Sequence, residues 1–214
     1  MIKGIIFDLD GVIVSTDDLH FMAWKKIASQ EGIVFDRTIN HQLRGVSRME
    51  SLEIILSKSN KKYTMDEKLA LAKIKNDYYV RLLDQLSQKD ILPGVTHLLD
   101  WLKQTQIKTA IGSSSKNAKT ILRKIGLYEM FDHITDGNDI LHSKPNPEVF
   151  LKAAHALGLE NSLCAVVEDA EAGIEAAKAA GMYAFGIGPA STYHKTDCPL
   201  TFIDEIKQTL KIQM

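Results

Sequence analysis

The sequence predicts an α/β protein: a Rossmann-like doubly wound parallel sheet as the core, with an inserted α-helical cap domain. Short apolar runs alternate with helical stretches along most of the chain, as in parallel sheets that are covered on both faces. The alternation stops over residues 15–81, where helix follows helix without a strand. A chain of 214 residues fits one core with a smaller insertion. We therefore expect residues 1–14 and 82–214 to form the core and residues 15–81 the cap.

Four short apolar runs, each ending in polar or small residues, predict buried strands. They cover residues 2–9, 107–112, 163–167 and 183–187. Ile134 marks a fifth, weaker candidate. Open α/β sheets bind ligands at the carboxyl ends of their strands, so the polar residues that follow these runs are the first candidates for a functional site.

Helical patterns fill the intervals between these runs. In the core they cover residues 117–125, 147–157 and 170–180, and in the cap residues 19–30, 49–56 and 65–83. The stretch 170–180 consists almost entirely of Ala, Glu, Lys and Ile, which are mostly strong helix formers, and Gly181 is a natural residue to end it.

Composition excludes several classes of protein. Hydrophobic residues make up 45% of the chain and charged residues 25%, which is ordinary for a globular domain. With 26 Lys and Arg against 27 Asp and Glu, no general polyanion-binding surface is implied, so we expect no nucleic-acid partner. No apolar run approaches the roughly 18 residues of a membrane span, and Asp8 and Asp10 interrupt the apolar start too early for a secretory signal. We expect no membrane partner.

The cysteines and the surface pattern suggest where and in what state the protein works. Cys164 and Cys198 form neither a zinc pattern nor a disulfide framework, which favours a reducing, cytoplasmic location. No exposed apolar stripe is evident, so we expect a monomer.

Residues 15–81 carry 12 basic and 9 acidic residues, and the remainder of the chain carries 14 basic and 18 acidic residues. A mildly basic insert facing an acidic core suits an anionic substrate above a metal site, although a random scatter of surface charge explains these small differences equally well.

Two acids end the first predicted strand. Asp8 and Asp10 stand at i and i+2, so in an extended chain their side chains point the same way. Two carboxylates at the end of a buried strand are costly unless they are paired or bind a cation. The alternative is a pair of acids that caps a turn into Gly11.

A second acidic pair, Glu168-Asp169, follows the strand at 163–167. Asp169 alone could be the N-cap of the following helix. Together with Asp8 and Asp10, however, the pair supplies an all-oxygen, carboxylate-rich site of the kind that Mg²⁺ prefers.

Two further loops add groups suited to phosphate. The serine hydroxyls and backbone N–H groups of residues 113–117, between a strand and a helix, form a possible phosphate cradle. Lys144 precedes a helix that starts with Pro147, and an ammonium fixed there reaches both phosphate and aspartate. A serine-rich turn or a lysine alone is weak evidence; the combination of four loops is what discriminates.

This combination resembles the haloacid-dehalogenase-like superfamily of phosphotransferases, over essentially the whole chain. The resemblance implies that Asp8 is the nucleophile, that Asp10 is the general acid/base, and that Ser113 and Lys144 hold the transferring phosphoryl group. It also implies a Mg²⁺ site whose residues are Asp8, Asp10, Glu168 and Asp169, and a helical cap inserted between the first two motifs.

The cap resembles the caps of sugar-phosphate mutases within that superfamily. The matching segments are His20-Phe21-x-Ala23-Trp24-Lys25, residues 40–52 with Arg44-Gly45-Val46-Ser47-Arg48, and Lys75-Asn76-Asp77-x-Tyr79. The resemblance implies that Arg48 grips the non-transferring phosphate and that His20 couples cap closure to Asp10. The other implied substrate contacts are Trp24, Arg44, Gly45, Val46, Ser51, Lys75, Ser114, Ser115, Lys116 and Asn117. Taken singly, a tryptophan on an amphipathic helix is usually core and a lone histidine is usually structural.

Three positions depart from the superfamily pattern. Ser15 stands where an aspartate is common, while Thr16 keeps the following hydroxyl and is retained among the expected catalytic residues. Arg44 replaces a lysine, which keeps the charge and changes the donor geometry. Ala170 stands where a serine is common and removes one hydroxyl near the sugar. None of these changes removes a catalytic group.

The resemblance implies an isomerase that interconverts β-D-glucose 1-phosphate and D-glucose 6-phosphate through an aspartyl-phosphate enzyme. β-Glucose 1,6-bisphosphate would be its intermediate and activator, Mg²⁺ its metal, and small sugar phosphates its only partners. The alternatives are a sugar-phosphate phosphatase on the same fold, in which water accepts the phosphoryl group, and a phospho-accepting signalling domain, which the long cap insertion disfavours.

Overall fold

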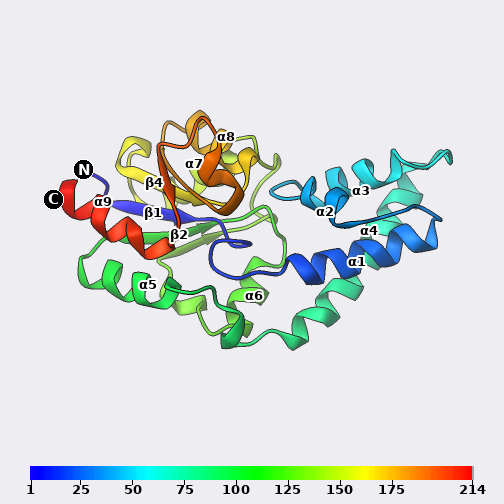
Figure 1. Ribbon diagram of the computed structural model, residues 1–214, viewed down its shortest axis with the longest axis horizontal. Coiled ribbons are helices and arrows are strands. Elements are labelled where there is room, and N and C mark those ends of the chain that lie inside the picture. The colour runs from blue at the N-terminus through cyan, green and yellow to red at the C-terminus, as the bar shows by residue number, and fades with distance from the viewer. Residues whose placement is uncertain (214) are drawn as a thin grey trace.

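A parallel sheet forms the centre of the computed structural model, which describes residues 1–213 (Figure 1). Within those residues the sheet has six strands in the order β3-β2-β1-β4-β5-β6, and every neighbouring pair is parallel. The strands are β1 (Gly4–Phe7), β2 (Lys108–Gly112), β3 (His133–Thr135), β4 (Cys164–Glu168), β5 (Tyr183–Ile187) and β6 (Cys198–Leu200). The predicted α/β class is confirmed, including the weak candidate around Ile134, which lies in β3.

Helices cover both faces of this sheet. α5 (Val95–Gln104), α6 (Ala118–Lys124) and α9 (Ile206–Gln213) lie on one face, and α7 (Glu148–Leu157) and α8 (Glu171–Ala179) on the other. Alternate side chains of the central strand serve the two faces: Ile5 and Phe7 pack with the first group, and Ile6 with the second. The sheet is therefore doubly wound, as predicted.

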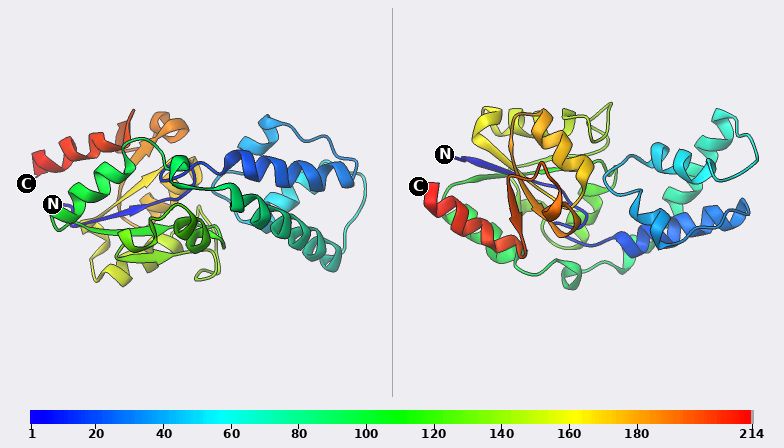
Figure 2. Two further views of the ribbon diagram at one scale, coloured as in Figure 1. Left: turned by 90° about the horizontal axis from the view of Figure 1, so that it is seen from below. Right: turned by 45° about the horizontal axis from the view of Figure 1, so that its top comes forward.

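The remaining four α-helices follow β1 directly and lie beyond the carboxyl ends of the strands (Figure 2). They are α1 (Asp17–Gln30), α2 (Arg37–His41), α3 (Arg48–Leu56) and α4 (Met65–Leu82). They share an apolar cluster of their own, with Trp24 from α1, Leu52 and Ile55 from α3, and Ala72 from α4. We call these helices and their loops the cap. The exact boundary at residues 14 and 82 stays a prediction.

Local signals explain where the cap helices begin. Ser47 and Glu50 form a capping box at the start of α3, and Thr64 and Glu67 form one at the start of α4. The N-cap residues of the two boxes, Ser47 and Thr64, lie just before the predicted helices. Short 3-10 turns connect other elements: Leu83–Gln85, Gln88–Asp90, Tyr128–Met130, Asn161–Leu163, Gly188–Thr192 and Ile203–Glu205.

Among the described residues no helix combines the length and the apolar character needed to cross a membrane. Cys164 is buried and Cys198 is half-buried, and both are free thiols, which agrees with the absence of a disulfide framework in the sequence.

The register of the sheet brings the predicted motifs to one edge. Phe7, the last residue of β1, pairs with Ile111 of β2 on one side and with Val167 of β4 on the other. Asp8, Ser113 and Asp169 follow these positions within two residues, so all three emerge at the edge that the cap overhangs.

Candidate active site

Three buried carboxylates meet at the carboxyl end of the central strands. Asp8 follows β1, Glu168 ends β4 and Asp169 comes next, and one oxygen from each lies within 4.8 Å of the others. Lys144 reaches them from the loop before α7, with its Nζ 2.5 Å from Oδ1 of Asp8 and 2.5 Å from Oε1 of Glu168. One ammonium group therefore pairs with two of the three buried acids, Asp8 and Glu168.

The cluster holds three carboxyl groups and one ammonium group, and this excess of acids, together with burial, shifts their pKa values. Burial raises the pKa of Asp8 to about 7 against the opposing charge of Lys144. Burial, followed by the charges of Glu168 and Asp8, raises the pKa of Asp169 to about 8. Burial lowers the pKa of Lys144, but the two carboxylates outweigh it and hold that pKa above its usual range. An all-oxygen donor set with surplus buried negative charge fits a hard divalent cation.

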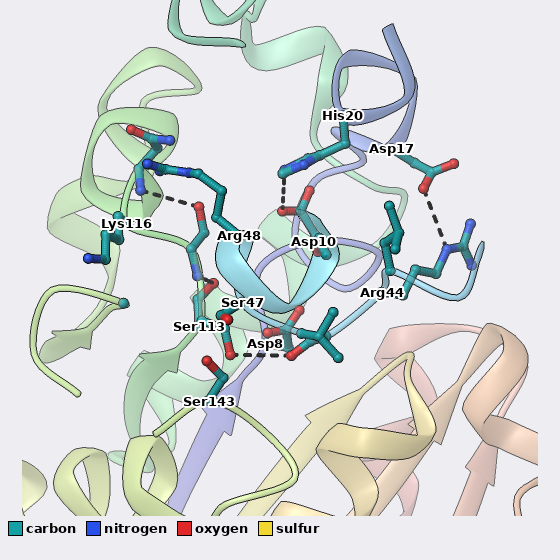
Figure 3. Close-up of a pocket in the computed structure, with 18 of the residues that line it drawn as sticks. Asp8, Asp10, Asp17, His20, Arg44, Ser47, Arg48, Ser113, Lys116 and Ser143 are labelled. Atoms are coloured by element: carbon teal, nitrogen blue, oxygen red, sulfur yellow. Dashed lines mark hydrogen bonds and ion pairs between the residues drawn. The ribbon is translucent and has the colours of Figure 1, made fainter. Parts of the chain in front are cut away.

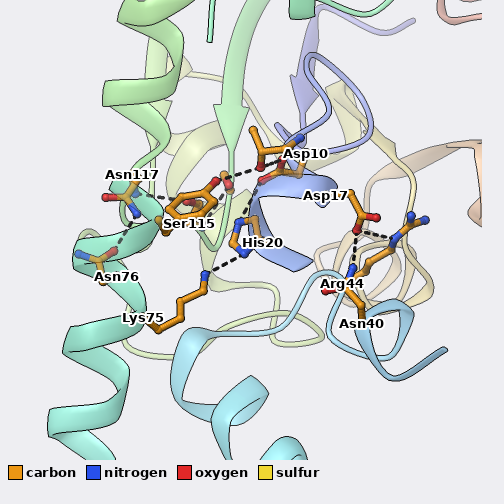
Figure 4. Close-up of polar contacts among 12 residues, drawn as sticks. Asp10, Asp17, His20, Asn40, Arg44, Lys75, Asn76, Ser115 and Asn117 are labelled. Carbon is orange, nitrogen blue, oxygen red and sulfur yellow. Dashed lines mark hydrogen bonds and ion pairs between the residues drawn. The ribbon is translucent and has the colours of Figure 1, made fainter. Parts of the chain in front are cut away.

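Asp10 lies apart from these three acids. Its Oδ1 accepts hydrogen bonds from the backbone N–H of Thr16, at 3.0 Å, and from the Thr16 hydroxyl, while its Oδ2 is 4.0 Å from Nε2 of His20 (Figures 3 and 4). The sequence placed this carboxylate in the metal cluster because strand residues at i and i+2 share a face. β1 ends at Phe7, however, so the alternation no longer holds at Asp10. The structure gathers three of the four predicted metal residues and turns the fourth side chain toward the cap.

Gly11 makes this turn possible. Its φ is +80°, which favours glycine, and a Cβ there would lie 2.2 Å from Oδ2 of Asp169. A side chain at this position would therefore push the first loop away from the acidic cluster.

The serine loop lies beside the acids. Ser113 follows β2, and its hydroxyl accepts a hydrogen bond from the backbone N–H of Ser115 at 3.1 Å. The loop after β3 supports it: Thr135 O accepts from the backbone N–H of Ser113, and Asn138 donates through Nδ2 to Lys116 O at 3.0 Å. Sequence reasoning missed Asn138, whose contact joins positions 22 residues apart.

The cap contributes a buried lysine, Lys75, and a half-buried arginine, Arg48, on its side of the cleft. Nζ of Lys75 is 3.0 Å from Nδ1 of His20 and lies over the rings of Trp24 and Tyr79, at 4.8 and 4.3 Å from their centroids. Burial and the charge of Arg48 lower the pKa of Lys75 well below its usual value. Burial and the charge of Lys75 likewise lower the pKa of His20, which is neutral near pH 7 as a result. An anion entering the cleft would relieve this crowding of positive charge.

Besides the contacts of Asp10, further polar contacts join the cap to the core. Asn117 donates through Nδ2 to Oδ1 of Asn76 at 3.0 Å (Figure 4), and the Ser114 hydroxyl donates to Gly45 O at 3.4 Å. Arg44 lies between the two parts, with Nε 3.5 Å from Oδ1 of Asp17 and NH1 4.0 Å from Oδ2 of Asp169.

One cavity of about 800 Å³ connects most of these groups (Figure 3). The predicted site residues line it with three exceptions, Thr16, Lys144 and Glu168, which lie buried behind its wall. Trp24 serves in two ways, because it lines the cavity and also belongs to the apolar cluster of the cap. The lining residues that the sequence had marked are Asp8, Asp10, His20, Trp24, Arg44, Gly45, Val46, Arg48, Ser51, Lys75, Ser113, Ser114, Ser115, Lys116, Asn117 and Asp169.

An acidic cluster with a lysine at the edge of a doubly wound sheet, closed over by a helical insertion, is the arrangement expected of a phosphotransferase. The sequence model of the haloacid dehalogenase-like hydrolases matches residues 2–181, and the chain belongs to that family. It is 48% identical to the β-phosphoglucomutase of Bacillus subtilis over 188 residues, which cover 87% of this chain and 83% of that one. It is also 31% identical to the fructose-1-phosphate phosphatase YqaB of Escherichia coli, over 86% of this chain and 95% of that one.

A solved structure extends the similarity to the whole fold. The crystal structure of a β-phosphoglucomutase from Clostridium difficile superposes with a TM-score of 0.92 at 40% identity, covering 100% of this chain and 99% of that one. The resemblance to the haloacid-dehalogenase-like superfamily is confirmed.

Proposed function

We propose that the protein is a β-phosphoglucomutase, which interconverts β-D-glucose 1-phosphate and D-glucose 6-phosphate through β-glucose 1,6-bisphosphate. The observation that carries the proposal is that one cavity has two ends suited to phosphate. Asp8, Lys144 and Ser113 lie at or behind its core end, and Arg48 and Lys75 line it from the cap. A sugar with a phosphate at each end can bind such a cavity in either orientation. The similarity to two β-phosphoglucomutases supports the same assignment.

Asp8 is the nucleophile of this reaction. An Asp8 oxygen attacks the phosphoryl group, the bond to the sugar oxygen breaks, and an aspartyl phosphate forms. Lys144, 2.5 Å from Asp8, offsets part of the repulsion between carboxylate and phosphate, which is about 4 kcal/mol per pair of unit charges at about 4 Å. The hydroxyl of Ser113 and the backbone N–H groups of its loop hold the phosphoryl oxygens.

Asp10 moves the proton. It protonates the departing sugar oxygen and later takes a proton from the incoming sugar hydroxyl. Thr16 and His20 hold this carboxylate at the cap side of the cleft, which keeps it from activating water before a sugar is enclosed. Arg48, Lys116 and Asn117 bind the phosphate that is not being transferred, and the rest of the cap lining contacts the sugar.

Asp8, Glu168 and Asp169 would hold a Mg²⁺ ion. The surplus negative charge of these three acids is what makes the site fit it. When bound, the ion supplies the positive charge they lack and draws electron density from the phosphoryl group.

Phosphorus NMR tests the proposal directly. The purified protein, given β-glucose 1-phosphate, Mg²⁺ and a trace of β-glucose 1,6-bisphosphate, should produce glucose 6-phosphate without stoichiometric release of inorganic phosphate. Steady phosphate release instead would establish the second candidate, a sugar-phosphate phosphatase, which the similarity to the Escherichia coli phosphatase favours. We also propose that the protein is a monomer and is located in the cytoplasm. Size-exclusion chromatography with light scattering tests the oligomeric state.

A further inference from the structure

Tyr79 links the two connections between cap and core. It lies on α4, near the end of that helix at Leu82, and is 1% exposed. Its hydroxyl is 2.9 Å from Oγ1 of Thr16, the residue that precedes α1. The chain enters the cap at Thr16 and returns to the core after Tyr79. This contact therefore joins the segment that enters the cap to the end of the helix that leaves it.

The direction of the hydrogen bonds along this link is determined. The Thr16 hydroxyl has one proton and donates it to Oδ1 of Asp10, because a carboxylate only accepts. Tyr79 must therefore be the donor to Thr16. Burial raises the pKa of Tyr79 well above its usual value, so the phenol keeps its proton. Hydrogen bonds in series polarise one another, and each strengthens the next.

The ring of Tyr79 also touches the group on the other side of Asp10. The centroids of the Tyr79 and His20 rings are 4.2 Å apart, and Nε2 of His20 is 4.0 Å from Oδ2 of Asp10. Tyr79 thus supports the two residues, Thr16 and His20, that hold the Asp10 carboxylate from both sides.

We propose that Tyr79 is a positioning residue that holds Asp10 at the cap side of the cleft through Thr16. The proposal rests on the proposed function, in which Asp10 is the general acid/base. Thr16 and Tyr79 both lie in the predicted cap, whereas Asp10 lies in the core, so movement of the cap against the core separates Thr16 from Asp10 and frees Asp10 to turn toward the substrate. Before closure, while Thr16 still holds Asp10, water that reaches the aspartyl phosphate finds no general base to activate it.

Tyr79→Phe tests this, because it removes the hydroxyl and keeps the ring beside His20. Hydrolysis of acetyl phosphate should rise relative to mutase turnover by about five- to tenfold, the factor that corresponds to losing one net hydrogen bond. The kcat of the mutase should fall while the KM for β-glucose 1-phosphate stays within about twofold, since the ring and the phosphate contacts remain. Tyr78→Phe is the matched control: Tyr78 is the next residue, half-buried, and packs under Lys26 at 4.1 Å, so all values should stay at wild type.

Substitutions at Thr16 show whether Tyr79 acts through that hydroxyl. Thr16→Val removes it at nearly constant shape, and Tyr79→Phe added to Thr16→Val should then change the ratio no further. Thr16→Ser keeps the hydroxyl and should restore the wild-type ratio. Additive effects in the double variant, or an unchanged ratio in Tyr79→Phe, would overturn the proposal. If Tyr79→Phe does not fold, the Thr16 variants still test the proposal. It is overturned if Thr16→Val and Thr16→Ser show the same ratio of acetyl phosphate hydrolysis to mutase turnover.

Proton NMR separates this proposal from the sugar assignment. The buried hydroxyl proton of Tyr79 should give a slowly exchanging signal without any substrate, lost in Tyr79→Phe and shifted in Thr16→Val. If the wild type lacks mutase turnover while this signal and the acetyl phosphate rate respond as described, the proposed substrate is wrong and the role of Tyr79 stands. If mutase turnover is present and neither responds, the role of Tyr79 is wrong.

Discussion

Raising the pH of the metal-free protein from about 6.5 to about 8.5 should remove the stability that two buried carboxyl groups of the acidic cluster contribute. The pKa of Asp8 rises from 3.8 to about 7 on folding and that of Asp169 from 3.8 to about 8, mainly through burial. The folded chain therefore keeps protons that the unfolded chain has released. Stability from a raised pKa is complete below the unfolded value and is lost as the pH climbs through the folded value. Over this window the two groups together give a loss of about 2–3 kcal/mol.

The lower end of the window avoids an opposing effect from His20. Burial and the charge of Lys75 lower its pKa, so below about pH 6.5 the unfolded chain takes up a proton there that the folded chain does not. For a chain of this length, about 2–3 kcal/mol corresponds to a fall in Tm of about 4–12 °C. Thermal unfolding followed by circular dichroism in excess EDTA measures it.

Two variants make the measurement specific to the acidic cluster. Asp169→Asn removes the titrating group with the higher pKa and should cut the loss from this pair to about one third, with a higher metal-free Tm at the alkaline end. Asp100→Asn, exposed on α5, should keep the wild-type slope. Mg²⁺ should flatten the wild-type slope because it binds the ionised cluster. A wild-type slope in Asp169→Asn would refute the reasoning, because the lowered pKa of Lys75 opposes the loss equally in both proteins and cancels in the comparison.

Three further predictions concern activity. Asp8→Asn and Asp8→Ala should abolish turnover in the phosphorus NMR assay while circular dichroism shows an intact fold, since no neighbouring group replaces the nucleophile. Excess EDTA should stop turnover and added Mg²⁺ should restore it; full activity in EDTA would contradict the metal assignment. Arg48→Ala should cut mutase turnover about 100-fold, for about 3 kcal/mol of lost anchoring, and leave acetyl phosphate hydrolysis nearly unchanged, because acetyl phosphate has no second phosphate to grip.

The fold was predictable where burial leaves a strong pattern in the sequence. The four apolar runs correspond to β1, β2, β4 and β5, since strands buried on both faces have no polar positions to interrupt them. β6 was missed because Cys198-Pro199-Leu200 is short and holds a proline, as an edge strand permits. Helix α5 was also missed, although its buried residues Val95, Leu98, Leu99 and Leu102 have helical spacing and could have been recognised.

The residue types of the site could be predicted from the sequence, but the orientations of their side chains could be predicted less well. Strand ends gather in any parallel sheet, so the convergence of Asp8, Ser113 and Asp169 follows from topology alone. The contact of Tyr79 with Thr16 joins residues 63 positions apart, and no local pattern encodes such a distance. The turn of Asp10 toward the cap likewise depends on the strand ending at Phe7, and strand ends are the least reliable part of a sequence-based assignment.

The two acids of Asp8-Leu9-Asp10 are held by different parts of the molecule. Asp8 is fixed to the core by Lys144, whereas Asp10 is held by Thr16, at the entrance to the cap. Leu9 between them is fully buried and anchors the segment. In the proposed reaction the nucleophile needs a constant position in line with the phosphoryl group, whereas the acid/base must be withheld until the sugar arrives. A cap inserted directly after the central strand meets both needs, because its movement can turn Asp10 while the buried Leu9 keeps Asp8 in place.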